Sequence, residues 1–583
     1  MPHPYRRGLT RLWKPRPGAA AAHSGQSLVT RVLASRGLSD PDAAKAFLEP
    51  SLRQLHDPSL IPDLDRAAER LLGALKGGEP VVIYGDYDVD GVTATTILYH
   101  MFKAVAPDAR VTSYIPHRLD EGYGLNASAL RQLAADGARV IVTVDCGVTA
   151  IEPAAAAREA GVDLIITDHH NPPSSLDQLP PAFAVVHPRR PDSRYPFGEL
   201  SGAGVAYKLA WRLATLHCGS PRVTGELRLL LVELLAFAAL GAIADIVPLV
   251  DENRTIARYG LERIPHSPNQ GLRALVRAAG LDGGTIDADH VGFALGPRLN
   301  ASGRMDHARD AVDLFTTAGP ERAAEIAANL CSLNDHRRAT ERKIAAAAAE
   351  LAESSGMTRP DRRAIVLAHP DWHAGVIGIV CSRLVEKFHR PTILLQLKDG
   401  CAHGSGRSVE GFGLHAALAR CSKHLITFGG HDMAAGMKLD AAELDAFTEA
   451  FIAEANAALA PEQLVGSVSY DCDADVGELT PDAVAALQSM APFGVGNPKP
   501  RLRLSSLRIE RRPEPFGSTS KHLSMVVKQN GRSMRMVAWN WAERRDELPA
   551  GLELDAVVSP KISGYSGLVE PVVEDLCPCV AAG

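Results

Sequence analysis

Three aspartates at alternate positions follow a short apolar run in this chain of 583 residues. The run Val81–Tyr84 predicts a buried strand, and it leads into Gly85–Gly91, which contains Asp86, Asp88 and Asp90. In extended backbone, alternate side chains point the same way, so we expect three carboxylates to face one small volume. Such carboxylates repel one another unless a cation lies among them. This loop therefore predicts a cation site directly after a buried strand.

Acids and imidazoles recur after the next two apolar runs. Val140–Val144 and Leu164–Thr167 predict two further strands, and the stretch 150–160 between them favours a helix. This alternation is typical of a parallel α/β sheet, whose carboxyl edge is where ligands bind. The residues at that edge are Asp145 after the second strand, and Asp168, His169 and His170 after the third. Asp245 adds a carboxylate after an apolar helix predicted for 226–244.

These side chains offer enough oxygen and nitrogen ligands for two divalent metals. Carboxylate and imidazole without thiolate favour manganese or magnesium over a structural zinc. Two metals about 4 Å apart activate a bridging water and hold phosphate oxygens, so hydrolysis of a phosphoester is the natural chemistry. Taken singly, the loop also fits a calcium loop or a solvated turn, a lone Asp fits a helix N-cap, and a His pair fits a structural role. The candidate ligands are Asp88, Asp90, Asp145, His169 and Asp245.

Composition excludes several classes of protein. Hydrophobic residues make up 46% and charged residues 22% of the chain, which argues against a disordered or fibrous protein. The net charge of -6 lacks the overall basic character of a nucleic-acid binder, so a polyanion site must be local. The nine cysteines are odd in number and form no CxxC pair, which favours reduced thiols and a cytoplasmic location. The apolar run 234–244 is too short to cross a bilayer.

The first 39 residues carry basic side chains and no acid. That bias is also typical of an organelle transit peptide, but four prolines interrupt any amphipathic helix there. A basic N-terminal arm of a cytoplasmic protein is the better interpretation.

The pattern along the chain predicts an α/β fold with several domains. An Ala-, Glu- and Arg-rich stretch, 320–354, predicts one or two long solvated helices that connect two α/β regions. From about residue 464, short alternating segments with Gly, Pro and Asn turns indicate a small β-barrel. The expected parts are a basic N-terminal arm 1–45, a parallel-sheet catalytic domain 46–318, a helical connector 319–358, a second α/β substrate-binding domain 359–460 and a C-terminal β-barrel 461–583.

Several motifs together resemble a known family. Asp168-His169-His170, with the aspartate loop, the segment 144–147 and the segment 242–249, is similar to the DHH phosphoesterase superfamily. Further segments resemble the RecJ family of single-stranded-DNA exonucleases within it, over most of the chain. They are 116–124, 296–304, 372–380, 404–408 and 428–431.

The resemblance implies a DHH domain, a DHH-associated domain and a C-terminal OB-fold. It also implies a 5'-to-3' exonuclease that releases 5'-mononucleotides with two manganese or magnesium ions, in recombination and repair, beside a RecQ-type helicase and a single-strand-binding protein. By this resemblance the five candidate ligands hold the metals, His170 lies near the scissile phosphate, and Asp86 and Asp168 are outer ligands or orienters. The residues implied to bind substrate are Arg118, Asn300, Arg304, Ser405, Arg407, Ser408 and His431, of which His431 fits a structural role as well.

The tail favours a polymer substrate. Five arginines between 501 and 512 form a local basic strip with one acid, Glu510. In the second α/β domain, a Gly-rich turn predicted at 404–408 would expose backbone N–H groups to phosphate. A solvated hairpin face fits the strip as well. A DHH phosphatase of small substrates and a non-catalytic DNA-binding relative remain alternatives; the tail argues against the first, and the intact ligand set against the second. Nothing in the sequence requires an oligomer, and we expect a monomer that binds no membrane.

Overall fold

The structure is a computed structural model, which describes residues 6–19, 25–117, 124–305, 308–564 and 566–579. The chain forms two compact units. One unit contains residues 49–337 together with 491–498, and the other contains 1–48, 338–490 and 499–583. Each unit therefore draws on segments far apart in the sequence. The domain boundaries expected from the sequence stay a prediction.

The unit formed by 49–337 and 491–498 is built on a five-stranded parallel sheet in the order β4-β3-β5-β6-β7. Its strands consist largely of valine and isoleucine, whose branched side chains suit a buried pleated surface. The strands are β3 (Val81–Tyr84), β4 (Val111–Tyr114), β5 (Val140–Thr143), β6 (Asp163–Thr167) and β7 (Ala184–Val186). The helices are α3 (Leu64–Gly77), α4 (Val89–Val105), α5 (Ala127–Ala135), α6 (Ile151–Glu159), α7 (Gly202–Cys218), α8 (Gly225–Ala244), α9 (Asp251–Arg263), α10 (Gln270–Ala278), α11 (Ala288–His290), a π-helix η6 (Val291–Leu295), α12 (Gly296–Met305) and α13 (Arg309–Thr316).

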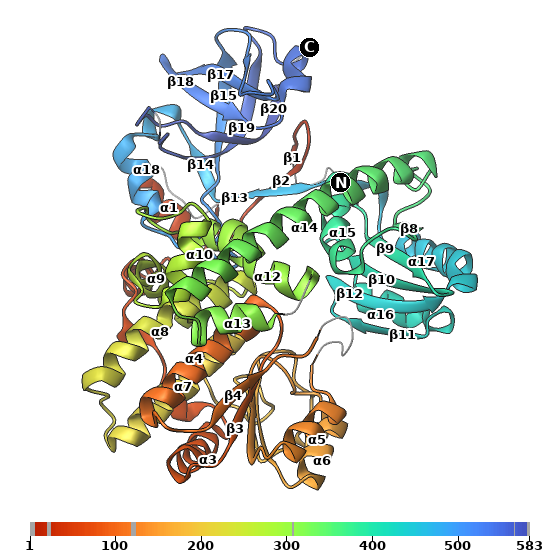
Figure 1. The fold of residues 1–583 in the computed structure, drawn as a ribbon. Helices are drawn as coiled ribbons and strands as arrows, with labels where there is room; N and C mark the ends of the chain where they lie inside the picture. The colour runs from red at the N-terminus through yellow and green to blue at the C-terminus, as the bar shows by residue number, and fades with distance from the viewer. Residues whose placement is uncertain (1–5, 20–24, 118–123, 306–307, 565, 580–583) are drawn as a thin grey trace. The chain divides into compact units, whose positions relative to one another are not determined.

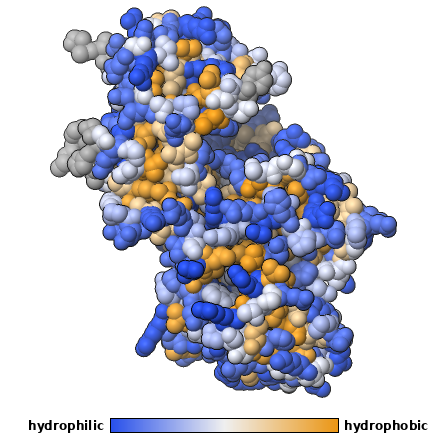
Figure 2. Space-filling model, turned by 90° about the vertical axis from the view of Figure 1, so that its left-hand side faces the viewer, coloured by the Kyte–Doolittle hydropathy of each residue, from blue (hydrophilic) through white to orange (hydrophobic). Residues whose placement is uncertain are grey.

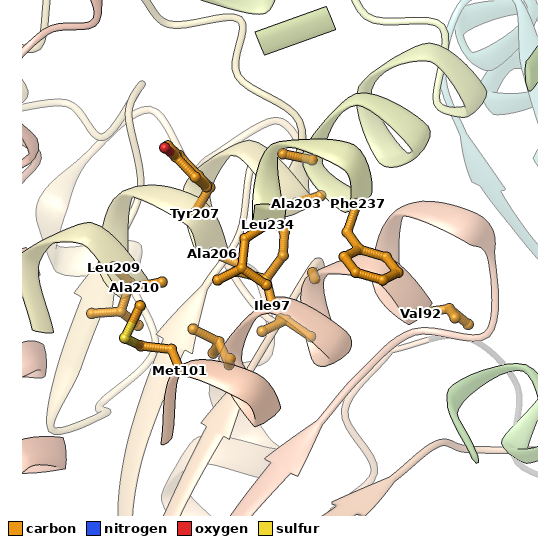
Figure 3. Packing of buried hydrophobic residues seen from close by; sticks show 14 of the residues in the cluster. Val92, Ile97, Met101, Ala203, Ala206, Tyr207, Leu209, Ala210, Leu234 and Phe237 are labelled. Atoms are coloured by element: carbon orange, nitrogen blue, oxygen red, sulfur yellow. The ribbon is translucent and has the colours of Figure 1, made fainter. Parts of the chain in front are cut away.

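Helices cover both faces of this sheet, as the alternation of strand side chains requires. Ile83 and Val142 face the larger core, which also contains residues of α3, α4, α7 and α8. Val82 and Ile141 face the opposite core, formed with α5 and α6. Figure 1 shows α5 and α6 on one side of the strands and α3, α4 and α7 on the other. In the larger core, Ile97 of α4 packs among residues of α7 and α8 (Figure 3).

Helix α8 is apolar around most of its circumference. Its length and composition would allow it to cross a membrane, but 56% of its most apolar window is buried inside the structure. It packs against α4, α7 and α9. Apolar residues on the face shown in Figure 2 form separate patches among hydrophilic ones. The apolar composition of α8 is therefore explained by its place at the centre of a protein core.

The connector is one helix, α14 (Pro320–Ser354), and it belongs in part to each unit. The prediction of a solvated helix is wrong for part of its surface. Ala323, Ile326 and Leu330 are buried in the large core, at the 3–4 residue spacing of one helix face. The many alanines and charged residues hid this narrow apolar stripe.

The other unit contains a second α/β region. Its five-stranded sheet has the order β11-β12-β10-β9-β8, in which the β8–β9 pair is parallel and the remaining pairs are antiparallel. The strands are β8 (Ile365–His369), β9 (Thr392–Lys398), β10 (Cys401–Arg407), β11 (Thr427–Gly430) and β12 (Ala434–Asp440), and the helices are α15 (Ala374–Phe388), α16 (Leu414–Arg420) and α17 (Leu444–Ala458).

The C-terminal region forms a closed barrel. Strand β15 pairs with both β19 and β17, which closes the circle β15-β19-β20-β18-β17. This confirms the predicted fold class, including the terminal β-barrel. The barrel and its flanking elements are α18 (Pro481–Gln488), β14 (Cys472–Ala474), β15 (Leu502–Ile509), β16 (Glu514–Phe516), β17 (His522–Gln529), β18 (Arg532–Ala538), β19 (Glu553–Ser559) and β20 (Val572–Pro578).

The basic N-terminal segment packs against this C-terminal region. It forms β1 (Arg6–Arg7), β2 (Leu12–Pro15), α1 (Leu28–Ser35) and α2 (Pro41–Leu48), and β2 pairs with β13 (Ser467–Tyr470). Its arginines form ion pairs with acids at the other end of the chain, namely Arg6 with Asp555, Arg11 with Glu574, Arg16 and Arg36 with Asp471, and Arg31 with Glu478. The positive charge of this segment is thus largely neutralised within the fold.

One buried carboxylate anchors the segment. Asp575 of β20 is fully buried and accepts hydrogen bonds from the backbone N–H groups of Thr10 (3.0 Å) and Arg11 (3.1 Å) and from the indole N–H of Trp13 (2.8 Å). Trp13 is itself buried in a small cluster with barrel residues.

We expect Asp575→Ala to loosen the N-terminal segment, because it leaves several buried donors without an acceptor. The local opening free energy should fall by about 2 kcal/mol, which makes amide exchange roughly thirtyfold faster. Hydrogen exchange of peptides covering 6–15 measures this directly. Asp546→Ala removes an exposed aspartate of the same region, which pairs with Arg512, and should leave these peptides unchanged. Equal exchange in both variants would contradict the anchoring role.

Candidate metal centre

The loop after β3 contains Asp86, Asp88 and Asp90, but its backbone is not extended throughout. Asp88 is the N-cap of α4, and its side chain accepts a hydrogen bond from the N–H of Gly91 at 3.1 Å. Asp90 lies in the first turn of that helix. The expectation of an extended loop is wrong, because Asp88 takes the N-cap role that aspartate favours. The turn requires Gly91, since a Cβ there would lie 2.6 Å from the backbone oxygen of Asp86.

A helix N-terminus holds Asp90 in place. Asp90 is 1% exposed and accepts hydrogen bonds from the N–H groups of Gly202 (2.5 Å) and Ala203 (3.0 Å), the first residues of α7. The partial positive charge of a helix N-terminus stabilises such a carboxylate. Gly241 of α8 leaves the necessary room, because a Cβ there would lie 2.2 Å from Asp90 Oδ1.

Asp145 follows β5 in a left-handed conformation, with φ of 65°. A non-glycine residue in this region carries a strain cost that structures usually keep at functional sites. Its side chain is buried, and Oδ1 lies 3.0 Å from His169 Nε2. His169 Nε2 also lies 3.6 Å from Asp245 Oδ2 and 3.8 Å from Asp90 Oδ2. One ring nitrogen thus faces carboxylates from three separate elements.

His169 fits a metal ligand. Burial, and then the charge of His170, lower the pKa of its imidazole to about 3, so the ring is neutral as ligation requires. Its Nε2 is buried and makes no well-formed hydrogen bond within the part of the chain that the structure describes. A divalent cation among these oxygens would give that nitrogen its partner.

Asp168 and His170 form a fixed ion pair beside this cluster. Asp168 Oδ1 accepts from His170 Nδ1 (2.8 Å) and from the N–H of His169 (2.7 Å), and Oδ2 accepts from the N–H of Val148 (2.8 Å). Burial alone would raise the pKa of Asp168, but these hydrogen bonds and the nearby imidazoles hold it well below its usual range. Burial opposes a charged His170, yet the Asp168 carboxylate raises the pKa of its ring to about 9. The pair therefore keeps a positive imidazolium at neutral pH.

The remaining carboxylates are electrostatically crowded. Burial, followed by repulsion from Asp88, raises the pKa of Asp90 to about 7. Burial and the charges of Asp90 and Asp88 raise the pKa of Asp245 to about 8, and the same causes raise that of Asp145 well above its usual value. Such shifts are typical of carboxylates that share a cation or a proton.

The ligand atoms form overlapping groups, each with its atoms within 4.8 Å of one another. The groups share Asp145 and His169, which is the arrangement expected of two adjacent metal sites. They are Asp86, Asp88 and Asp145; Asp90, His169 and Asp245; and Asp145, His169 and His170. The carboxylates and imidazoles predicted at the strand ends and after α8 thus lie together, and Asp168, which is outside these groups, orients both histidines.

Comparison with known proteins fits this arrangement. Family models match the DHH family N-terminal domain at residues 80–241, the DHHA1 domain at 361–457 and the RecJ OB domain at 470–574. The single-stranded-DNA-specific exonuclease RecJ of Bacillus subtilis is 37% identical over 93% of this chain and 67% of its own length. That of Dickeya dadantii is 37% identical over 87% of each chain. The chain belongs to the RecJ family.

Solved structures of RecJ proteins also resemble this chain in fold. A crystal structure of RecJ from Thermus thermophilus in complex with Mn2+ covers 98% of this chain and 79% of its own, with a TM-score of 0.79 and 30% identity. Another, of the exonuclease RecJ bound to manganese, covers 71% of this chain and 99% of its own, with a TM-score of 0.59 and 35% identity.

Two of the predicted substrate residues lie on α12, next to the aspartate loop of this RecJ-family chain. Asn300 Oδ1 accepts a hydrogen bond from the N–H of Val89 at 3.2 Å, so this side chain holds the start of α4. Gly303 packs so closely that a Cβ would lie 2.8 Å from the backbone oxygen of Tyr87. Arg304 is half-buried in the last turn of α12, one turn beyond Asn300. Arg118 lies outside the described residues.

The predicted Gly-rich turn at 404–408 is wrong. Ser405 and Arg407 lie inside β10, whose backbone pairs with β9 on one side and β12 on the other. The glycines serve sheet packing, since a Cβ at Gly404 would lie 2.6 Å from Met437 Sδ. Ser408 Oγ donates to the backbone oxygen of Phe412 at 2.6 Å. His431 is exposed and follows β11. All of these residues belong to the other unit.

The basic strip of the tail is largely neutralised. Arg503 forms a bidentate pair with Asp473, and Arg501, Arg511 and Arg512 each have a carboxylate partner. A different feature of the barrel is exposed instead. Trp539 is 49% exposed and lies against the rings of His522 (4.6 Å between centroids) and Phe516 (5.6 Å).

Two residues that lie near the metal centre were not identified from the sequence. His187 Nε2 lies 2.7 Å from the backbone oxygen of His170, and Arg189 Nη2 donates to the backbone oxygen of His169 at 2.7 Å. Both follow β7, the next parallel strand, so the same argument about strand ends could have found them. Together they fix the backbone that carries the two histidines.

The raised carboxyl pKa values predict that manganese binding releases protons. Near pH 7 the metal-free cluster holds protons on Asp90 and Asp245, and a cation must displace them. Manganese affinity should therefore fall as the pH is lowered from about 8 to about 6. Calorimetric titration in buffers of different ionisation enthalpy counts the released protons. Asp136→Asn, an exposed change in the same unit, should leave the count unaltered. Binding without proton release would contradict the assigned crowding.

Proposed function

We propose that this chain is a metal-dependent exonuclease that degrades single-stranded DNA from the 5' end to 5'-mononucleotides, in DNA recombination and repair. The observation that carries the proposal is the group of ligand atoms within 4.8 Å at the carboxyl edge of the parallel sheet, in a chain of the RecJ family. Its relatives are named single-stranded-DNA-specific exonucleases. The 5' polarity rests on the family resemblance.

In this proposal five residues hold two manganese or magnesium ions, and Asp86, which lies beside Asp88 and Asp145, is an outer ligand or orienter. When bound, such ions activate a water and neutralise the phosphate oxygens. The α7 N-terminus fixes Asp90, and the peptide bonds around His169 are fixed by Asp168 and Arg189. The rest of the fold thus supplies the rigidity that a two-metal site needs. The five ligands are Asp88, Asp90, Asp145, His169 and Asp245.

His170 is assigned to the scissile phosphate. Its ring is half-exposed on the side of the cluster, and Asp168 keeps it protonated near neutral pH. A fixed positive charge there stabilises negative charge that develops on the phosphoryl oxygens. Asp168 acts through His170 and the backbone, because both of its oxygens accept hydrogen bonds from protein donors.

The assignment of substrate residues is narrower than the resemblance alone implies. Arg304, Arg407, Arg118 and Ser405 remain candidates for backbone phosphates, to which a guanidinium offers a bidentate fork. Asn300 supports the metal loop through Val89, and Ser408 closes a turn through Phe412. His431 is kept as a phosphate contact in this proposal. A cytoplasmic monomer that works with a RecQ-type helicase and a single-strand-binding protein completes it.

We expect Asp145→Ala to reduce hydrolysis at least about 1,000-fold while DNA binding stays measurable, because Asp145 belongs to two of the ligand groups. The assay digests one single-stranded oligonucleotide labelled at its 5' or 3' end, with manganese, magnesium or chelator, beside its duplex and its RNA counterpart. Metal-dependent release of labelled mononucleotide from the 5' end, with the duplex spared, is the expected result. Asp136→Ala serves as the matched control.

Other outcomes of this assay would contradict the proposal. Intact DNA together with cleavage of dinucleotides or pyrophosphate would indicate a phosphatase of small substrates. Equal loss of binding and hydrolysis in Asp145→Ala would count against a metal role for that side chain.

The exposed ring cluster of the barrel predicts a base contact. Stacking of one base on an aromatic ring contributes about 1–3 kcal/mol, so Trp539→Ala should raise KM for a long oligonucleotide roughly tenfold with little change in kcat. Hydrolysis of a dinucleotide should change less, because a dinucleotide offers few bases for stacking. Leu568→Ala is the control, because Leu568 is also exposed in the same region and has no ring. An unchanged KM in Trp539→Ala would remove this cluster from the DNA path.

A further inference from the structure

A short piece of the C-terminal sequence packs with the unit that contains the metal centre. Residues 491–498 belong by their contacts to that unit, whereas Met490 and Lys499 on either side belong to the other. The parallel sheet and every strand-end ligand come from 49–337. The segment therefore adds no ligand, and its role must lie in what it contacts.

It contacts the loop that follows Asp245. This loop runs from the C-cap of α8 to the start of α9, and it contains two non-glycine residues with positive φ, Ile246 at 62° and Asp251 at 46°. A β-branched residue in this region is a true outlier, and such strain persists only where the surroundings fix it. Ile246 is 67% exposed, so its own side chain does not supply that restraint.

The segment 491–498 contacts this loop at Leu249 and Val250. The N–H of Leu249 donates to the backbone oxygen of Val495 at 2.7 Å. A Cβ at Gly494 would lie 2.8 Å from Leu249 Cδ1, and a Cβ at Gly496 would lie 3.1 Å from Val250 Cγ1. Gly496 also has a φ of 74°. The two glycines thus allow the segment to lie directly on the strained loop.

Two buried polar side chains fix the segment, one from α9 and one from within the segment itself. Arg254 of α9 is 2% exposed and donates to the backbone oxygens of Ala491 (3.0 Å) and Pro492 (3.4 Å). Asn497 is 1% exposed and donates to the same oxygen of Pro492 at 2.8 Å. Burying an arginine is costly unless its donors find acceptors, and the carbonyl oxygens of this segment accept from Arg254.

We propose that the segment 491–498 is a positioning element of the metal centre, and that Arg254 and Asn497 are its positioning residues. Arg254 ties the segment to α9 beside the strained loop after Asp245, and Asn497 fixes the shape of the segment itself. Through this contact the C-terminal sequence sets the position of the Asp245 carboxylate relative to Asp90 and His169. The inference rests on the proposed role of Asp245 as a metal ligand.

The test measures manganese binding by the full-length chain. Calorimetry and the electron paramagnetic resonance signal of free Mn2+ give the number of sites and their affinities, independently of activity. Asp245→Asn defines the signal of the site that Asp245 serves. Arg254→Met should weaken that same site about 10–100-fold and leave the other unchanged. Arg254→Lys keeps one donor and should give an intermediate affinity, and Asn497→Ala should act in the same direction as Arg254→Met.

A matched control separates this effect from general loss of packing. Arg363 also donates to backbone oxygens, those of Asn456 (2.7 Å) and Leu459, but in the other unit. Arg363→Met should leave both manganese sites unchanged. Hydrogen exchange of peptides covering 245–254 should accelerate in Arg254→Met and not in Arg363→Met.

Two results would overturn the inference, and they differ from failure of the proposed function. Arg254→Met and Asn497→Ala that both bind manganese like the parent chain would show that the segment does not position Asp245. Equal weakening by Arg363→Met would reduce the effect to general stability. Failure of the proposed function itself would appear in the parent chain, as absence of manganese binding or no change in Asp245→Asn.

Discussion

Repulsion among buried carboxylates is the interaction on which the catalytic unit depends. Asp90, Asp145 and Asp245 lie around one imidazole nitrogen, and their pKa values rise because burial and mutual charge disfavour ionisation. A chain can gather such groups only if other parts of the fold fix each of them. Parallel strands deliver two of the elements to one edge, and the N-terminus of α7 stabilises Asp90. The destabilising cluster is thus supported by the most regular part of the fold.

Much of this architecture could be predicted, because the information is local. Runs of valine and isoleucine identify β3, β5 and β6, and the polar residues after each run belong to the carboxyl edge of a parallel sheet. The detailed geometry of the aspartate loop could not be predicted in the same way. An alternating motif fits both an extended strand and the start of a helix. The helix forms here, because the Asp88 side chain caps it by accepting a hydrogen bond from the N–H of Gly91. The ligand set survived that error because both conformations bring the carboxylates to one edge.

Features that depend on partners distant in the chain could not be predicted from the sequence. The arginines at both ends of the chain suggested free positive charge, but they have acidic partners in the fold. For the N-terminal arginines those partners lie more than four hundred residues away, as for Arg31 with Glu478 and Arg36 with Asp471. The Gly-Ser-Gly stretch suggested a phosphate-binding turn, and it became the interior of β10 because Met437 and Leu395 require small neighbours there. In each case the sequence showed correctly which residues were present, but it did not show their partners in the fold. Those partners decide what a charged residue or a glycine does.

This neutralisation changes how the C-terminal barrel can meet a nucleic acid. Surface ion pairs contribute little stability and are screened by salt, so the exposed Arg511 and Arg512 could exchange a carboxylate partner for a phosphate with little change in free energy. An exposed ring such as that of Trp539 needs no such exchange, because a base that stacks on it would displace no charged partner. If the barrel binds DNA as proposed, contacts through rings and weakly held arginines would tolerate any base sequence and release the strand easily. Those are the properties that an enzyme needs if its substrate must advance by one nucleotide after each cleavage.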